Sequence, residues 1–234
     1  MIGIIGAMEE EVESLKKLMN DLEIRSYRGF LFYKGKIADK DIVLMQSGIG
    51  KVNASVGTTI LLEHFLVELI INIGTAGGIK PSCEVLDIVL SEKVSYHDVD
   101  VTAFQYEYGQ VPKCPRYFTS DEKLLNLTER ILKEANKKYH KGLIVSGDAF
   151  IHDEKQIKNI AKYFPEALAV EMEAAAISHV CYIYKIPFIV IRSLSDIAGK
   201  KSAISFDKYL QLSSENACMI VKKLIEKVPL GTLN

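Results

Sequence analysis

The sequence lacks a net charge of either sign and any long hydrophobic run. Its 234 residues contain 29 Lys and Arg against 30 Asp and Glu, a formal net charge of -1. No general electrostatic attraction to nucleic acid or to an anionic membrane is therefore expected. The N-terminal MIGIIGAMEEE passes straight from a short apolar stretch to acids, unlike a signal peptide, and no other stretch could span a bilayer. We predict a cytoplasmic protein that binds a small ligand, with no nucleic-acid or membrane partner.

Closely spaced cysteines are also lacking. The chain has four, none in a CxxC pair: Cys83, Cys114, Cys181 and Cys218. Neither a zinc site nor a dithiol redox motif is indicated, and we expect reduced thiols. His97, Asp98 and Asp100 come nearest to a set of metal ligands. Because Asp98 would point away from its neighbours in an extended chain and no fourth ligand is evident, we predict no metal and no cofactor.

Short apolar runs rich in Ile and Val alternate with amphipathic segments of helical period. The predicted strands are residues 2–5, 42–45, 69–73, 143–145 and 188–191. The predicted helices are residues 9–22, 52–65, 154–163, 174–184 and 206–228. Runs that are apolar throughout are typical of strands buried on both faces, and their alternation with helices predicts an α/β fold with a mainly parallel sheet. No repeat or linker divides the chain, so we predict one domain over residues 1–234.

Residues 97–118 form a long stretch without periodicity. The stretch is rich in aromatic residues: Phe104, Tyr106, Tyr108, Tyr117 and Phe118. Long irregular loops inside compact domains are usually functional, and exposed aromatic side chains favour a contact with a ligand or a second subunit.

Two glycine motifs are similar to nucleotide-binding loops without matching them. Gly3 and Gly6 follow a predicted strand but lack the G-x-G-x-x-G spacing. The SGIGK motif at residues 47–51 is similar to a phosphate loop, but Met45 stands where the first glycine would be. A tight turn from strand to helix explains this motif equally well.

Carboxylates occur at three places next to predicted strands. Residues 9–11 are three glutamates that open a helix, where the helix dipole alone favours acids. Glu171 and Glu173, in AVEMEAAA, lie between an apolar strand and an alanine-rich helix, where a helix cap or an ion pair is as good an explanation as catalysis. Asp196, in RSLSD, follows a strand at the place where open α/β sheets bind ligands. With GTAGG at residues 74–78, these segments are candidates for one shared crevice.

Taken together, the motifs resemble those of the 5'-methylthioadenosine/S-adenosylhomocysteine nucleosidases. They occur in the order GIIGAMEEEV, SGIGK, GTAGG, YHDVDVTAFQYEYGQ, VSGDAFI, AVEMEAAA and RSLSD, and they cover essentially the whole chain. The resemblance implies the nucleoside phosphorylase superfamily. It also implies a three-layer α/β/α single domain with a twisted, partly barrel-like mixed central sheet, and a homodimer.

The resemblance further implies a role for each acid. Glu11 would be the general base, Glu173 would bind the ribose hydroxyls, and Asp196 would protonate the purine. These groups would hydrolyse the N-glycosidic bond of methylthioadenosine and S-adenosylhomocysteine, releasing adenine and the 5-substituted ribose. Further candidate substrates are 5'-deoxyadenosine and 6-amino-6-deoxyfutalosine.

The binding residues implied by the resemblance surround the three parts of such a substrate. Near adenine they are Ser195, Phe150, stacked on the base, and the backbone of Ile151. Near the ribose and the attacking water they are Met8, Thr75, Met172 and Arg192. Ala76 and Gly77 belong to the same site. The pocket for the 5' substituent would be lined by Ile49, Ile151 and Phe206, and by Val101 and Phe104 from the partner subunit.

Two alternatives stay open at this point. A purine nucleoside phosphorylase would share the fold and use phosphate in place of water. A phosphate site usually needs clustered arginines, whereas Arg192 is the only arginine among these motifs, and Glu11 would repel a dianion. The second alternative is a non-catalytic nucleoside-binding module on the same scaffold, against which the three intact acids argue.

Overall fold

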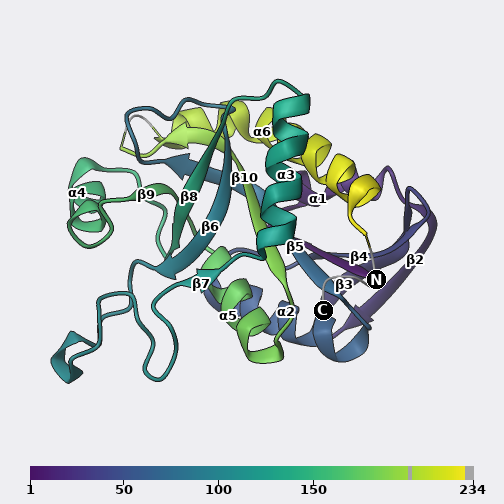
Figure 1. The fold of residues 1–234 in the computed structure, drawn as a ribbon, viewed down its shortest axis with the longest axis horizontal. Coiled ribbons are helices and arrows are strands. Elements are labelled where there is room, and N and C mark those ends of the chain that lie inside the picture. The colour runs from purple at the N-terminus through teal and green to yellow at the C-terminus, as the bar shows by residue number, and fades with distance from the viewer. Residues whose placement is uncertain (200–201, 230–234) are drawn as a thin grey trace.

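The computed structural model describes residues 1–199 and 202–229 (Figure 1). The strands in this part of the chain are β1 (Ile2–Gly6), β2 (Asn20–Tyr27), β3 (Phe30–Ile37), β4 (Lys40–Gln46), β5 (Leu69–Gly78), β6 (Ile88–Tyr96), β7 (Phe118–Thr119), β8 (Tyr139–Ser146), β9 (Ala167–Glu171) and β10 (Phe188–Ile197). The helices are α1 (Glu9–Lys16), α2 (Lys51–His64), the 3-10 helix η1 (Thr102–Phe104), α3 (Glu122–Glu134), α4 (Glu154–Tyr163), α5 (Ala174–Tyr184) and α6 (Ser202–Lys227). None of the helices described here is both long enough and apolar enough to cross a membrane.

The described strands form one sheet that partly closes on itself. Their order is β10-β6-β8-β9-β5-β1-β4-β3-β2, and β7 pairs with β6. A further pairing between β10 and β5 closes the first five strands of this order into a barrel. Strands β1, β4, β3 and β2 continue outward from β5 as an open extension (Figure 1).

Successive side chains of the central strands face different helical layers. Ile2 and Ile4 of β1 belong to a core cluster with residues of α1, α3 and α6. Ile5 belongs to a second cluster, with residues of α2 and α5. A third cluster packs α4 against β8 and β9. In Figure 1 α6 accordingly lies above the sheet and α2 and α5 lie below it. The prediction of a three-layer α/β/α fold with a partly barrel-like mixed sheet is confirmed.

Two predictions drawn from periodicity alone are wrong. The sheet is mixed and not mainly parallel, because β10 pairs antiparallel with β6 and β9 pairs antiparallel with β5. The helix expected over residues 9–22 ends at Lys16, and Asn20 begins β2, which pairs with β3. Leu15, Leu18 and Leu22 have helical spacing, but only Leu15 lies in α1 and is buried. From Asn20 onward the exposed segment pairs with β3, which satisfies its backbone instead.

The segment between β6 and β7 is mostly irregular and reaches away from the body of the molecule (Figure 1). The part of the segment that leads back to β7 contacts the last residue of α4, Tyr163. Tyr108 stacks on Tyr163 with ring centroids 3.8 Å apart, and the Arg116 guanidinium donates to the carbonyl oxygens of both tyrosines. The base of the segment is therefore fixed by these contacts. Its outer part, which includes η1, is exposed.

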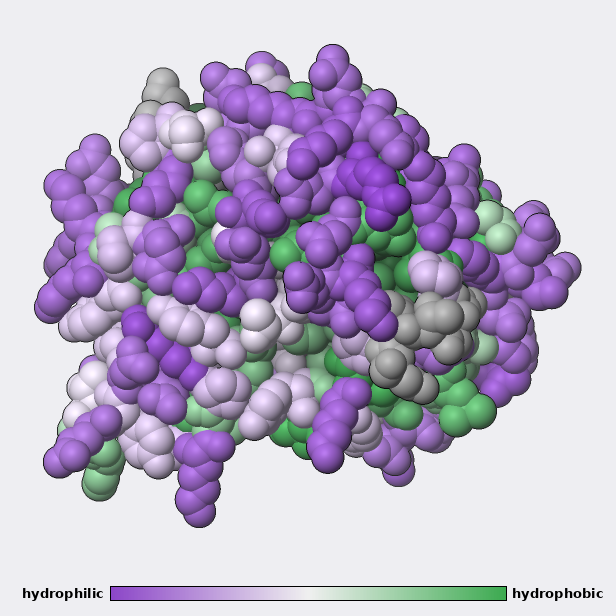
Figure 2. Space-filling view, viewed as in Figure 1, coloured by the Kyte–Doolittle hydropathy of each residue, from purple (hydrophilic) through white to green (hydrophobic). Residues whose placement is uncertain are grey.

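The face of the molecule seen in Figure 2 is covered mainly by hydrophilic residues, with hydrophobic residues visible in small areas between them. Several apolar side chains near the start of α2 and on η1 are much more exposed than a core residue. The exposed fractions are 53% for Ile49, 73% for Val52, 43% for Val56 and 76% for Phe104.

Candidate active site

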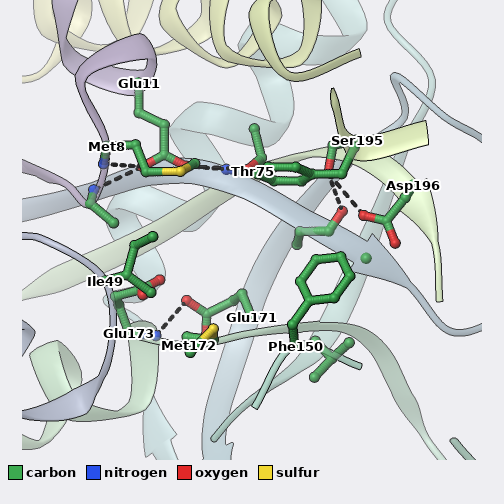
Figure 3. Close-up of a pocket in the computed structure, with 15 residues that line it drawn as sticks. Met8, Glu11, Ile49, Thr75, Phe150, Glu171, Met172, Glu173, Ser195 and Asp196 are labelled. Carbon is green, nitrogen blue, oxygen red and sulfur yellow. Dashed lines mark hydrogen bonds between the residues drawn. The ribbon is translucent and has the colours of Figure 1, made fainter. Parts of the chain in front are cut away.

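A cavity of about 260 Å³ opens where β1, β5, β9 and β10 end (Figure 3). Its walls come from segments far apart in the sequence, as is usual at the strand ends of an α/β sheet. The lining residues are Ala7, Met8, Glu11, Ile49, Thr75, Ala76, Gly77, Phe150, Val170, Glu171, Met172, Glu173, Ser195, Asp196 and Phe206. The three candidate acids therefore share one cavity.

Glu11 is buried and is surrounded by hydrogen-bond donors. One carboxylate oxygen accepts the backbone N–H groups of Ala7, at 2.8 Å, and Met8, at 3.1 Å. The other oxygen accepts the backbone N–H of Thr75, at 2.9 Å, and the Thr75 hydroxyl, at 3.2 Å. The turn between β1 and α1 and the end of β5 thus both donate to this side chain (Figure 3). Hydrogen bonds of this kind favour the ionised carboxylate.

Asp196 lies on a different wall of the same cavity and receives fewer hydrogen bonds (Figure 3). The Ser195 hydroxyl donates to it at 2.9 Å. Burial raises the pKa of Asp196, and the hydroxyls of Ser195 and Ser202 oppose this rise only in part. A register shift in β10 falls between Leu194 and Asp196. Gly77 faces the carboxyl on β5, where a Cβ atom would lie 3.1 Å from Asp196 Oδ2.

Glu171 and Glu173 flank Met172 at the junction of β9 and α5, and their surroundings differ. Glu171 accepts the backbone N–H groups of Glu173 and Ala174, so it caps the N-terminus of α5. Glu173 accepts the backbone N–H of Gly50 at 2.8 Å. Burial and the neighbouring Glu171 carboxylate raise the pKa of Glu173. The sequence left open whether these acids form a cap, an ion pair or a site, and Glu171 forms both a cap and an ion pair.

Arg192 lies behind the cavity wall and is not among the lining residues. It is 2% exposed, and its Nη2 donates to Glu171 and to Asn72, both at 2.7 Å. Gly74 separates it from Glu11. A Cβ atom at Gly74 would lie 2.8 Å from Glu11 Oε1 and 3.3 Å from Arg192 Cζ. The glycine in GTAGG thus allows a guanidinium and a carboxylate to approach the same point.

The other predicted residues lie at different distances from the cavity. The rings of Phe150 and Phe206 pack edge to face at the cavity rim, with centroids 5.8 Å apart and planes inclined by 76°. Ile151 lines a smaller adjoining pocket, which also contacts Phe150 and Asp196. Val101 and Phe104 line neither pocket of their own chain. Their position at the exposed end of the segment between β6 and β7 leaves them available to another molecule.

Three lining residues are missing from the predicted site set, namely Ala7, Val170 and Glu171. Ala7 and Val170 carry no chemical signal in the sequence, although Ala7 adjoins the predicted site residue Met8. Glu171 stood out as a carboxylate next to a strand, and its spacing from Glu173 was a usable signal. In the part of the chain that the structure describes, no three His, Cys, Asp or Glu side chains are grouped so as to hold a metal ion.

Comparisons with known proteins agree with this geometry. A family model described as the phosphorylase superfamily matches residues 1–226. A solved 5'-methylthioadenosine/S-adenosylhomocysteine nucleosidase from Neisseria meningitidis, in complex with methylthio-immucillin-A, is 42% identical with a TM-score of 0.95, covering 97% of this chain and 99% of its own. The corresponding nucleosidase from Colwellia psychrerythraea, in complex with adenine, is 42% identical with a TM-score of 0.93, over 97% and 96% of the two chains.

A third solved structure is similar over almost the same length of the chain. An S-adenosylhomocysteine nucleosidase from Streptococcus pyogenes, in complex with 5-methylthiotubericidin, is 36% identical with a TM-score of 0.96, and the match covers 98% of this chain and 97% of that one. The identity is high, and the matches run almost the full length of both chains. The chain therefore belongs to the phosphorylase superfamily and, within it, to the 5'-methylthioadenosine/S-adenosylhomocysteine nucleosidases.

Proposed function

We propose that Asp196 and Glu11 act as the acid and the base of this enzyme, and that Glu173 binds the ribose hydroxyls. The chain is an N-glycosyl hydrolase that releases adenine from 5'-methylthioadenosine and S-adenosylhomocysteine. The observation that carries the assignment of roles is that two similarly buried carboxyls share one cavity in different surroundings: backbone N–H groups donate to Glu11, whereas only serine hydroxyls act on Asp196 among the described residues.

The reaction needs help at both ends of the bond that breaks. In an oxocarbenium-like transition state, positive charge grows on the ribose and negative charge grows on the purine. A protonated carboxyl can neutralise the purine by donating to N7, and Asp196 suits this role because its raised pKa favours the neutral acid. The Ser195 hydroxyl, 2.9 Å from Asp196 Oδ1, would hold the acid in position.

The attacking water needs a charged carboxylate on the other face of the sugar, as in an inverting glycosidase. Glu11 suits this role because four donor groups favour its ionised form. The guanidinium of Arg192, across Gly74, adds positive charge nearby. Because Thr75 and Met8 hold Glu11 from two sides, the carboxylate would keep its direction while a water is polarised.

Glu173 would bind the ribose hydroxyls and oppose the cation that develops on the ring. Its raised pKa means that its ionisation is finely balanced. A growing positive charge close by would favour the carboxylate form and would be stabilised by it in turn. Met172, beside it in the cavity wall, would pack against the ribose.

The rest of the substrate would occupy the less polar parts of the cavity. Phe150 would stack on adenine, and the backbone of Ile151 would read the edge of the base. Ile49 and Phe206 would contact the 5' substituent, together with Val101 and Phe104 of a second subunit. Side chains at the cavity wall offer few polar groups there, which agrees with a thioether substituent. 5'-Deoxyadenosine and 6-amino-6-deoxyfutalosine are candidate further substrates on the same grounds.

The exposed apolar side chains support a homodimer. Val52, Val56 and Phe104 are 43% to 76% exposed, more than a stable monomer surface favours for neighbouring apolar groups. In a dimer, replacing Phe104 by alanine should raise KM more than it lowers kcat, because the ring contacts the substrate of the other subunit without touching the reacting bond. The four cysteines are free thiols, which suits the cytoplasm.

The assignment is tested by incubating the protein with methylthioadenosine, with and without phosphate, and identifying the sugar product. Free 5-methylthioribose and adenine, at a rate that phosphate leaves unchanged, are the expected result. No Lys or Arg occurs among the described residues that line the cavity, and Arg192 behind the wall already donates to Glu171 and Asn72. A phosphate dianion beside Glu11 would therefore lack the clustered cations that such a site usually needs. Phosphate-dependent release of a sugar 1-phosphate would contradict the use of water as the nucleophile.

A further inference from the structure

The N-terminus of α2 has no cap of its own and binds carboxylates from two other loops. Its N-cap residue is Gly50, which has no side chain, and its first turn contains no acid. The Gly50 N–H donates to Glu173 Oε1 at 2.8 Å, and the Lys51 N–H donates to Asp148 Oδ1 at 2.9 Å. The positive end of the helix dipole favours both contacts. The SGIGK motif thus does bind anions, and these anions are side chains of the same protein.

Side-chain charges close these contacts into a ring. Lys51 Nζ donates to Asp98 Oδ2 at 2.7 Å and lies 3.6 Å from Asp148 Oδ2. The Asp148 N–H donates to the same Asp98 oxygen at 2.9 Å. Lys51, Asp98 and Asp148 follow β4, β6 and β8 respectively. We name these three residues the three-loop clamp.

The clamp is partly shielded from solvent and its backbone is constrained. The side chains of Lys51 and Asp98 are only 21% and 30% exposed, so their ion pair is screened less than one on an open surface. Gly50 has a φ of +94°, and a Cβ atom there would lie 3.3 Å from Asp148 Oδ1. Glycine therefore allows the turn that brings the Gly50 N–H to Glu173.

We propose that Lys51 is a positioning residue for Glu173: through Asp98 and Asp148 it holds the Gly50 N–H against the Glu173 carboxylate, fixing the direction of that carboxylate and favouring its ionised form. The inference rests on the proposed role of Glu173 in binding the ribose. Lys51 itself lines neither the cavity nor the adjoining pocket, so it acts through Gly50 and not on the substrate.

The charges around Glu173 show why this one hydrogen bond matters. Burial and the Glu171 carboxylate raise the pKa of Glu173, and Glu11 adds to the rise. The Gly50 N–H and the Arg192 guanidinium lower it. Arg192 is already bound to Glu171 and Asn72, so the Gly50 N–H is a separate stabilising contact that depends on the α2 turn. Burial lowers the pKa of His97, which lies near Asp98 and Glu171, so this ring stays neutral at and above neutral pH.

The first test compares Lys51→Met with the wild-type enzyme across a pH–rate profile. Without the clamp, the Gly50 N–H would donate less well to Glu173, and the carboxylate would form only at higher pH. We expect kcat at pH 7 to fall about tenfold, the effect of weakening one hydrogen bond to a charged group. The acidic limb of the profile should move to higher pH, the alkaline limb should stay in place, and KM should change less than kcat.

Three further variants separate positioning from general damage. Lys51→Arg keeps the positive charge and should restore most of the lost rate. Lys158→Met removes a lysine that is 79% exposed on α4 and should match the wild-type enzyme. Asp98→Asn removes one charge of the clamp and should move the acidic limb in the same direction as Lys51→Met, so it serves if the Lys51→Met protein does not fold.

Hydrogen exchange of the Gly50 amide, followed by NMR, tests the clamp without any turnover. The amide should exchange faster in Lys51→Met than in the wild-type protein. If the wild-type enzyme released no adenine, the proposed function would fail, and the exchange rates would still decide whether the clamp holds Gly50. An unchanged exchange rate, or faster exchange with an unchanged pH–rate profile, would overturn the positioning role of Lys51.

Discussion

Glu11 and Asp196 lie in the walls of one cavity and are buried to nearly the same degree, with 3% and 2% of their surfaces exposed. Glu11 receives two backbone N–H groups from the start of α1 and an N–H and a hydroxyl from Thr75. Asp196 receives the hydroxyl of Ser195. Burial raises the pKa of Asp196. The two groups therefore differ in their donors and not in their burial.

Two carboxyl side chains of the same fold thus have surroundings that suit opposite proposed roles, that of a base and that of an acid. At Glu11 the turn after β1 and the end of β5 converge, and each presents free backbone N–H groups to the carboxylate. Asp196 is the second-last residue of β10, and its carboxyl receives the Ser195 hydroxyl in place of such backbone N–H groups. The two carboxyls therefore differ in the donors that reach them.

The largest effect is expected from Asp196→Asn. The amide has nearly the same shape as the neutral acid but cannot give up a proton to the purine. We expect kcat for adenine release to fall by about 10³–10⁴-fold, the upper part of the range for a positioned proton donor. Steady-state kinetics on methylthioadenosine measure this loss, and a loss smaller than about tenfold would remove Asp196 as the acid.

Glu11→Gln should follow, with a loss in kcat of about 10²–10³-fold, because a water attacking a cation-like sugar needs less activation than the departing purine. The same substitution also tests, through protein stability, whether Glu11 has more hydrogen-bond donors than Asp196. The new NH₂ group would face backbone N–H donors, and we expect the free energy of unfolding to fall by about 1–3 kcal/mol. Denaturant unfolding of both variants measures this. Equal stability losses in Glu11→Gln and Asp196→Asn would contradict the difference in donors.

A third expected effect is a pH dependence of stability that belongs to Asp196. Its pKa is raised in the folded protein above the value of about 3.9 that an Asp has in an unfolded chain. The stability that this group contributes is therefore complete below about pH 3.9 and is lost as the pH rises through the folded-state pKa. Asparagine has no such loss. The Tm of Asp196→Asn minus that of the wild type should grow from pH 5 to pH 9, and a constant difference would argue that Asp196 does not titrate in this interval.

The smallest effect is expected from Thr75→Val. This change removes the hydroxyl that donates to Glu11 at 3.2 Å and keeps the backbone N–H at 2.9 Å. Because three of the four donors remain, we expect kcat to fall by only about two- to tenfold. A loss as large as that of Glu11→Gln would mean that the hydroxyl, and not the backbone, determines the state of the carboxylate.

Much of the fold could be predicted from the sequence where burial dictates the pattern. The helices expected over residues 154–163 and 174–184 coincide with α4 and α5, and each predicted apolar run lies inside an observed strand. The exposed strand β2 and the direction of β9 could not be predicted. Apolar periodicity reports which face is buried, but pairing partners such as β3 and β5 lie elsewhere in the chain.

The site, too, could be predicted only in part from the sequence. Acids next to apolar strands indicate residues 9–11, Glu171, Glu173 and Asp196 as candidates, and the family resemblance selects Glu11, Glu173 and Asp196 among them. These three acids share one cavity. Local sequence could not indicate that Arg192 would pair with Glu171 and lie behind the wall, nor that Gly50 and Lys51 would hold carboxylates from two distant loops. Those contacts depend on three-dimensional neighbours that only the barrel brings together.

The protonation states of Glu11 and Asp196 are the most direct test of their assignment as base and acid. A carbon-13 NMR titration of the side-chain carboxyls, with the two signals assigned from the Glu11→Gln and Asp196→Asn variants, would follow each group separately. We expect that near neutral pH Asp196 still carries its proton while Glu11 is ionised. If both carboxyls are ionised there, or if Glu11 carries the proton and Asp196 does not, the assignment of acid and base is contradicted.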